Sequence, residues 1–215
     1  GTSLLAGVRF EKRETNYKDS EGIEFSPSED FWGGEISLNK DLSDNLLGYV
    51  SIARGFKAGG FNIDGTLDSD LREFNEEYLI EYETGLKGAF FGDNLQVRLA
   101  IFMDDRRDQQ VKSSLVRPRS DGSTEFIDFL GNAAAGTNKG LEGSIVWELN
   151  PNWRLTLDAG ILRATFDEYI NEFGENLSGR DQAHAPSYMA SAGIRFAQGR
   201  WTASLTADTK DEFYF

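Results

Sequence analysis

Basic side chains gather in one stretch of the chain, and they are the residues best suited to hold a ligand. Arg106, Arg107, Arg117 and Arg119 lie there together with Lys112, and aspartates stand beside the first two arginines. A guanidinium group binds a carboxylate or a phosphate through two parallel hydrogen bonds. The four arginines are therefore candidate contacts to an anionic ligand, although pairing with the neighbouring aspartates explains the same pattern.

A glycine-rich segment, YVSIARGFKAGGFN at 49–62, holds the other candidate contacts. It lacks the Gly-Lys-Ser/Thr ending of a phosphate loop, and no helical pattern follows it. Its glycines let the chain reverse direction with positive φ. We interpret the segment as a structural turn and keep Arg54, Lys57 and Asn62 as candidate ligand contacts.

Composition excludes several kinds of chemistry. The chain of 215 residues has no cysteine, one histidine (His184) and a net charge of −14. Thiol catalysis and cysteine-bound zinc are thereby excluded, and nucleic acid is not expected as a partner because its phosphates require clustered Lys and Arg. Asp64, Asp68 and Asp70 lie close together but match no known calcium-loop spacing. We predict no enzyme activity, no cofactor and no metal site.

The elements that carry these residues repeat with a period of two. Apolar Leu95, Val97 and Leu99 alternate with Gln96 and Arg98, for example. An apolar residue at every second position predicts a β-strand with one apolar and one polar face. The pattern predicts nine strands, at about 2–16, 30–39, 46–55, 76–89, 95–112, 124–149, 154–170, 186–196 and 201–215, with a bulge near 131–140.

Short and long connections alternate between the expected strands. Short turns fall at 41–45, 91–94, 150–152 and 197–200, and long connections fall at 17–29, 56–75, 113–123 and 171–185. Acidic residues concentrate at 17–30, 64–77 and 167–181, whereas the third long connection carries basic residues. Aromatic residues cluster near both ends of the strands. These features are typical of a β-barrel in a bacterial outer membrane. We therefore predict an all-β fold, an antiparallel up-and-down transmembrane β-barrel segment.

The number of strands indicates part of a larger barrel. Nine strands of alternating direction leave the first and the last running the same way, so these two cannot pair antiparallel and close the barrel. Open strand edges in lipid leave backbone groups unsatisfied at a cost of several kcal/mol each. We expect further strands outside this chain, and outer-membrane lipid and lipopolysaccharide as partners. Lipopolysaccharide phosphates are thus an alternative ligand for the basic stretch.

Four segments resemble those of TonB-dependent outer-membrane receptors, in the expected order: YVSIARGFKAGGFN (49–62), EYLIEYETGLKG (77–88), NAAAGTNKGLEG (132–143) and LSGRDQAHAPSY (177–188). The last segment departs from the family pattern, because Gln182-Ala183-His184 replaces the Leu-Pro pair often found there. The resemblance covers about 45–215, whereas residues 1–44 agree in pattern only.

The resemblance implies a barrel of about 22 strands closed by a plug domain of the same parent protein. Residues 1–215 would be part of the single barrel domain, with the plug and the remaining strands outside this chain. It further implies active uptake of a scarce, large extracellular nutrient: a siderophore complex, a cobalamin or an oligosaccharide. The TonB complex would supply the energy through the plug. The alternatives are a barrel adhesin or enzyme, and a soluble β-sandwich binding module that buries its apolar face.

Overall fold

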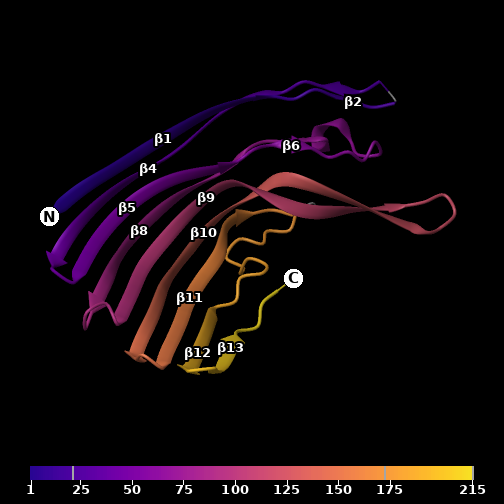
Figure 1. The fold of residues 1–215 in the computed structure, drawn as a ribbon. Coiled ribbons are helices and arrows are strands. Elements are labelled where there is room, and N and C mark those ends of the chain that lie inside the picture. The colour runs from indigo at the N-terminus through magenta and orange to yellow at the C-terminus, as the bar shows by residue number, and fades with distance from the viewer. Residues whose placement is uncertain (21, 172, 215) are drawn as a thin grey trace.

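Nine long strands form one antiparallel sheet in the computed structural model, which describes residues 1–20, 22–171 and 173–214. Strands that follow one another in this set are also neighbours in the sheet (Figure 1). This arrangement confirms the predicted nine-stranded, up-and-down order. The strands are β1 (Thr2–Glu14), β4 (Ser28–Ser43), β5 (Leu46–Lys57), β8 (Glu77–Phe90), β9 (Leu95–Pro118), β10 (Thr124–Asn150), β11 (Trp153–Tyr169), β12 (Tyr188–Gln198) and β13 (Trp201–Lys210).

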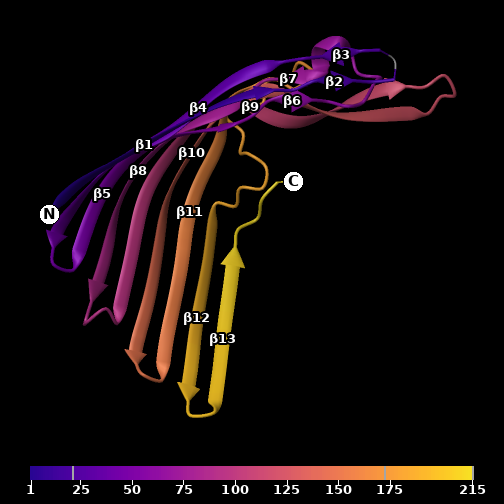
Figure 2. The same cartoon turned by 45° about the horizontal axis from the view of Figure 1, so that its top comes forward.

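Shorter elements lie beyond one end of the sheet (Figure 2). β2 (Tyr17–Lys18) pairs with β3 (Glu24–Phe25), and β6 (Gly60–Phe61) pairs with β7 (Glu73–Phe74). The 3₁₀ helix η1 (Ser69–Leu71) lies between β6 and β7 along the chain. The first two long connections therefore contain local hairpins. Within the described residues, no helix is long and apolar enough to cross a membrane.

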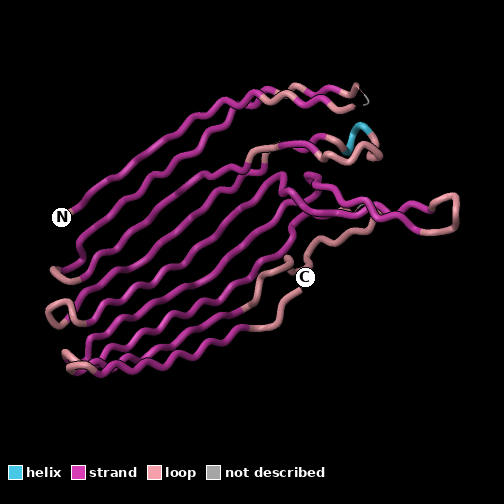
Figure 3. The backbone as a smooth tube through the Cα atoms, turned by 45° about the vertical axis from the view of Figure 1, so that its right-hand side comes forward, coloured by secondary structure: helices cyan, strands magenta, loops and turns pink. Residues whose placement is uncertain are grey.

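Tight turns occupy the other end of the sheet (Figure 3). They join β4 to β5, β8 to β9, β10 to β11, and β12 to β13. Gly92 and Gly199 have φ values of 66° and 57°, in the left-handed region that glycine adopts without a steric penalty. The four predicted short turns are thereby confirmed at this end of the sheet.

The third long connection differs from the prediction. β9 continues to Pro118 and β10 begins at Thr124, so 113–118 is strand and not loop. The two strands project beyond the sheet as a paired hairpin (Figure 1). Lys112 Nζ lies 2.7 Å from the Asp128 carboxylate, and Ser114 also donates a hydrogen bond to that carboxylate. The segment SSLVRP at 113–118 does not alternate apolar and polar residues, which is why apolar periodicity did not reveal the extension.

Strand β10 is irregular, and strand β13 is shorter than expected. The β10 register shifts between Asn132 and Ala134 and again before Gly136, which confirms the predicted bulge. β13 ends at Lys210, so the expected continuation of the strand through 211–214 was wrong. Its expected last residue, 215, lies outside the described residues.

The register gives the sheet one apolar face and one polar face. Ile36 lies opposite Ile52, Ile52 opposite Tyr82, and Tyr82 opposite Met103. These four side chains are 45–49% exposed, because no second layer of described residues covers them. A soluble sandwich would bury such a row, whereas a membrane barrel turns it toward lipid.

Candidate functional site

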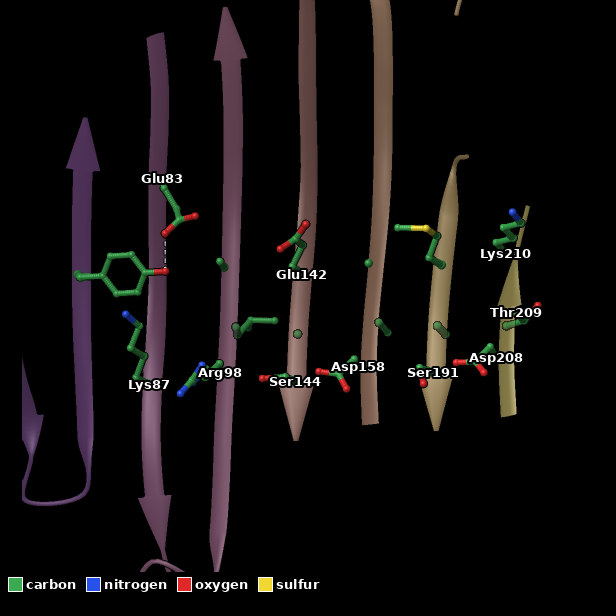
Figure 4. Close-up of a pocket in the computed structure, with 18 residues that line it drawn as sticks. Glu83, Lys87, Arg98, Glu142, Ser144, Asp158, Ser191, Asp208, Thr209 and Lys210 are labelled. Atoms are coloured by element: carbon green, nitrogen blue, oxygen red, sulfur yellow. Dashed lines mark hydrogen bonds between the residues drawn. The ribbon is translucent and has the colours of Figure 1, made fainter. Parts of the chain in front are cut away.

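The polar face holds a broad, open hollow across the middle of the sheet. Its volume is about 790 Å³, and side chains from β5 to β13 line it (Figure 4). The Tyr49 hydroxyl donates a hydrogen bond to Glu83 at 2.6 Å, and Lys87 Nζ lies 4.6 Å from the centroid of the Tyr49 ring. These contacts fix part of the wall without closing it.

Charges of both signs are interspersed over this hollow. Figure 4 shows acidic Glu142, Asp158 and Asp208 on the same wall as basic Arg98 and Lys210. Such a surface is suited to contact with water or with another polar protein surface, because each charge keeps access to solvent or to an opposite charge.

A hydrogen-bonded cluster lies at the loop-bearing end of the polar face. Arg106 binds the Glu77 carboxylate through Nε at 3.1 Å and through a second guanidinium nitrogen, and its Nη1 lies 3.4 Å from Gln182 Oε1. Glu77 also accepts a hydrogen bond from the Gln110 backbone N–H at 3.0 Å. Glu77 and Gln182 are each 6% exposed. The cluster therefore joins β8, β9 and the last long connection.

Strand β10 approaches this cluster closely because residue 136 has no side chain. A Cβ atom at Gly136 would lie 2.4 Å from Gln182 Nε2 and 2.9 Å from the Thr165 carbonyl oxygen. Gln182 Nε2 donates to that same carbonyl at 3.0 Å. The bulge in β10 thus makes room for a side chain supplied by a distant connection.

Buried acceptor atoms accompany the cluster. Asp104 Oδ1, Gln109 Oε1 and Asn138 Oδ1 have no hydrogen-bond donor within the part of the chain that the structure describes. An unsatisfied buried acceptor costs roughly 1–3 kcal/mol. This region therefore favours a donor from water or from a bound molecule, beside the guanidinium group of Arg106.

The first and second long connections pack around Arg72, which is 1% exposed. Its Nε donates to the Asn62 carbonyl at 3.0 Å, and its Nη2 lies 3.2 Å from the Tyr17 hydroxyl and 3.4 Å from the Asp19 carboxylate. The guanidinium carbon also lies 5.7 Å and 5.6 Å from the ring centroids of Tyr17 and Phe25. Two connections far apart in the sequence are thereby joined.

Asn62 joins the second connection to the hairpin extension. Its Nδ2 donates to the carbonyls of Leu71 at 2.7 Å and Leu130 at 2.8 Å, and its Oδ1 accepts from the Leu130 N–H at 2.8 Å. A buried cluster of Leu67, Ile127 and Phe129 supports the same junction, together with Leu71 and Leu115. The three connections therefore form one packed loop assembly.

Hydrogen bonds keep loop carboxylates ionised. Thr66 donates to Asp64 through its hydroxyl at 2.6 Å and its N–H at 2.9 Å, and these bonds hold the pKa of Asp64 below its usual value. Ser123 lowers the pKa of Asp121 in the same way. The described residues contain no group of acidic or histidine side chains placed to hold a metal ion.

The structure places some predicted contact residues on the polar face and others on the apolar face. Lys57 lies opposite Glu77, on the polar face with Arg106. Arg54 lies opposite Ile80 and Arg107 opposite Tyr78, both on the apolar face. Arg107 forms an ion pair with Asp105 at 2.9 Å on that same face. Arg54 and Arg107 are therefore directed away from the hollow.

The remaining predicted contacts lie in the loop assembly. All side-chain hydrogen bonds of Asn62 described above serve to join protein segments. Arg117 binds the Thr66 carbonyl and lies 3.4 Å from Asp68, and Arg119 lies 2.8 Å from Glu125. Much of the basic stretch thus pairs within the chain, and direct ligand contact by these residues stays a prediction.

Sequence reasoning did not single out Gln109 and Gln182 as site residues. Both are buried in the Arg106 region. The available signal was the departure of Gln182 from the Leu-Pro pattern in its segment. Its partner could not be found from the sequence, because 76 positions separate it from Arg106.

The chain belongs to the TonB-dependent receptor-like β-barrel family, which it matches over residues 1–215. It is 28% identical over 195 residues to the pesticin receptor of Yersinia pestis, an alignment covering 87% of this chain and 27% of the relative. The same values hold for the pesticin receptor of Yersinia enterocolitica. The chain therefore spans about a quarter of the length of the curated relatives it matches. Family members are outer-membrane receptors and transporters and not enzymes. This confirms the predicted outer-membrane location and the prediction of no enzyme activity.

Solved structures show the same fold. The ferric yersiniabactin uptake receptor of Yersinia pestis matches with a TM-score of 0.74 and 22% identity, over 96% of this chain and 31% of that one. The siderophore receptor PiuA of Acinetobacter baumannii gives a TM-score of 0.72 with 16% identity, over 99% and 31% of the two chains. The copper transporter OprC gives 0.66 with 16% identity, over 95% and 31%. The predicted barrel fold is confirmed.

Proposed function

We propose that this chain is part of an outer-membrane transporter that imports a ferric siderophore complex. The observation that carries the proposal is the buried Glu77–Arg106–Gln182 cluster at the loop-bearing end of the polar face. In a membrane barrel the polar face lines the lumen, so this cluster lies where a ligand entering past the loops would arrive. Names of similar proteins, including a ferric yersiniabactin uptake receptor and a siderophore receptor, support this nutrient class.

Arg106 and Lys57 are the proposed lumenal contacts. Both lie on the polar face, and a siderophore complex presents oxygen atoms that a guanidinium or ammonium group can bind. The unpaired oxygens Asp104 Oδ1, Gln109 Oε1 and Asn138 Oδ1 would accept hydrogen bonds from the ligand or from its bound water. Arg117 and Arg119, on the projecting hairpin, would make the first contact with an anionic ligand.

The proposed energy source is the TonB complex, acting through a plug domain of the same parent protein. Residues 1–215 would be part of one barrel domain, and the plug would contact the mixed-charge hollow. A polar wall with both signs of charge can meet a protein surface through many exposed ion pairs and water bridges. Such contacts are individually weak, so they allow a plug to rearrange during transport.

Uptake by iron-limited cells producing the full-length parent protein tests this function. Radioactive iron is supplied as ferric yersiniabactin or ferric citrate, and radioactive copper is supplied separately. We expect uptake of a ferric complex that disappears in cells lacking TonB. Iron uptake that persists without TonB would overturn the energy source, and copper uptake without iron uptake would overturn the nutrient class.

Substitutions locate the binding site in the same cells. We expect Arg106→Ala to weaken binding of the imported complex by about tenfold, since a hydrogen bond to a charged group contributes roughly 1.5–3 kcal/mol. Arg154→Ala is the matched control, because Arg154 pairs with Glu148 at the turn-bearing end.

Arg117→Ala with Arg119→Ala should slow capture of an anionic complex. Unchanged binding in whole cells would exclude that capture role.

A further inference from the structure

Two carboxylates lie directly opposite each other on the polar face of the sheet. Glu81 on β8 is paired with Asp104 on β9, and Asp104 is paired with Asn138 on β10. Both acidic side chains are half-buried. Like charges directly opposite on neighbouring strands destabilise a sheet, so this pair is unfavourable unless a positive group lies beside it.

The described residues do not supply that positive group. Neither Glu81 nor Asp104 forms an ion pair among them. The charged neighbours of Glu81 include the carboxylates of Glu35 and Glu83. Arg106 lies near Asp104, but its guanidinium group is bound in the cluster described above. The acidic pair therefore needs a cation from outside these residues.

Three oxygen atoms beside the pair are buried without a hydrogen-bond donor in the part of the chain that the structure describes. They are Asp104 Oδ1, Asn138 Oδ1 and Gln109 Oε1. Gln109 is 8% exposed, and its Oε1 would lie 3.3 Å from a Cβ atom at Gly136, which places it over the polar face. Because buried acceptors are normally paired, the missing group must donate several hydrogen bonds.

Small residues leave room for that group. Ala53 lies opposite Glu81, and Glu35 lies opposite Ala53. Neighbouring strands are about 4.8 Å apart, so the strands that carry Glu35 and Glu81 are separated by about 10 Å. Another open hollow, of about 870 Å³, is lined in part by these three residues. Pockets for small molecules have volumes of roughly 300–1,000 Å³, so the hollow is large enough for a ligand.

We propose that Glu81 and Asp104 bind a protonated amine of the imported ferric complex. The inference rests on the proposed import of such a complex, and it assigns the ligand both charges: oxygen atoms for Arg106 and an ammonium group for the two carboxylates. An ammonium group carries three N–H donors and no acceptor, which matches the buried oxygens. The acidic long connections attract a positive group toward the same end of the barrel.

A basic side chain of the plug is the competing occupant. Asp104 and Arg106 lie two residues apart on the same face of β9, about 7 Å along the strand. One ligand can therefore span both groups, which favours the ligand as the source of the amine. In a crystal structure of the ligand-free, full-length parent protein we expect solvent beside Asp104 Oδ1. A plug lysine or arginine within ion-pair distance of Glu81 or Asp104 would overturn the inference.

Small bromine-labelled probes locate the site without knowledge of the siderophore. Crystals of the parent protein are soaked separately in para-bromobenzylammonium, the neutral para-bromobenzyl alcohol and the anionic para-bromobenzoate, and bromine is located by anomalous scattering. We expect the ammonium probe alone to bind beside Glu81 and Asp104. Absence of this probe, or equal occupancy by the alcohol, would overturn the site.

Isosteric substitutions test which side chains hold the ammonium probe. Glu81→Gln with Asp104→Asn should abolish the bromine signal, because the charges are removed while the shapes are kept. Glu148→Gln is the matched control, since Glu148 lies on the same face at the turn-bearing end and pairs there with Arg154. If the double variant does not fold, Asp104→Asn alone should lower occupancy at least about threefold. Unchanged occupancy in these variants would contradict the assignment.

Import separates this inference from the proposed function. Siderophores from the spent medium of the iron-limited source bacterium are acetylated at their amines with N-hydroxysuccinimidyl acetate and then loaded with radioactive iron. Cells producing the natural parent protein should take up the acetylated complexes at least about tenfold more slowly than the untreated ones, whereas the double variant should take up both equally slowly.

Each negative result of the import experiment has its own meaning. Equal uptake of treated and untreated complexes by the natural protein would overturn the ammonium site and leave ferric import standing. Absence of TonB-dependent uptake from the untreated pool would overturn the proposed function, whereas the bromine signal at Glu81 and Asp104 would still report whether the site binds an ammonium group.

Discussion

Arg72 shows at the scale of one residue how surface connections become a packed assembly. A buried charge requires compensating groups around it, and here they come from two connections and two aromatic rings. Loops are usually exposed and mobile, whereas this side chain is enclosed by its neighbours. Arg72 therefore joins the first two connections, together with the ring contacts of Phe61 with Tyr17 and Phe25.

Removing the counter-charge of Arg72 should loosen the loop assembly. We expect Asp19→Ala to lower local stability by about 3 kcal/mol, because the guanidinium group stays buried without its carboxylate. Hydrogen exchange at the amides of 60–74 measures the change. Lys18→Ala is the control, since the Lys18–Glu24 pair is 70% and 59% exposed and such pairs contribute at most about 1 kcal/mol. Equal exchange in the two variants would contradict the role of the buried pair.

Asp64 makes the turn at 64–66 dependent on pH. Its folded pKa is lowered by Thr66, so its contribution to stability is present above the ordinary pKa and is lost as pH falls through the lowered value. We expect Thr66→Val to return the pKa of Asp64 toward its usual range, as measured by carboxyl NMR of aspartate-labelled protein in micelles. Asp128, whose pKa is lowered chiefly by Lys112, should not change.

At the scale of elements, β10 connects the lipid-facing sheet to the loop assembly. Its regular part pairs with β9 and β11, and its bulge at 132–136 precedes the part that enters the hairpin extension. Bulges bend a strand and redirect side chains. Gln182 therefore reaches Arg106 past Gly136, where a side chain would occupy the same space.

Close packing within β10 gives a prediction about two glycines. A Cβ atom at Gly140 would lie 2.4 Å from the Ile161 carbonyl and 2.7 Å from the Phe102 ring, whereas one at Gly143 meets ordinary contacts at 3.6 Å. We expect Gly140→Ala to lower the free energy of unfolding by about 1–3 kcal/mol and Gly143→Ala to change it little. Urea unfolding of the full-length parent protein in lipid, followed by tryptophan fluorescence, measures both. Similar midpoints would show that β10 yields at position 140.

At the scale of the whole molecule, the sheet leaves two edges. β1 and β13 lie at opposite ends of the strand order and run in the same direction, so they cannot pair antiparallel with each other. Every edge left open in lipid exposes unpaired backbone groups. We therefore propose that strands outside this chain complete the membrane barrel.

Isolated residues 1–215 should not insert into lipid as a folded monomer. We expect this piece to associate through β1 and β13, because pairing between copies is the available way to satisfy those edges. Analytical ultracentrifugation in detergent, together with protease protection in vesicles, tests this expectation. A protease-resistant monomer would contradict it, and the full-length parent protein is the control.

Strand positions were predictable because each long strand alternates apolar and polar residues, as Leu95, Val97 and Leu99 illustrate. The hairpin extension was missed because 113–118, SSLVRP, does not alternate, and its apolar Leu115 packs against Ile127 and the distant Leu67. Arg106 was predicted as a candidate contact, but its partners Glu77 and Gln182 were not. Spacing along the chain does not encode a contact that depends on the register of several strands and the path of a distant loop.

The sequence by itself determined the strands, the two faces and the family, since a period of two and ordered local segments are properties of neighbouring residues. Only the tertiary structure decided which arginines face the lumen, which face lipid and which hold loops together. The physical reason is that a strand fixes the side of each residue relative to its neighbours, whereas its partner depends on interstrand register, bulges and folded connections.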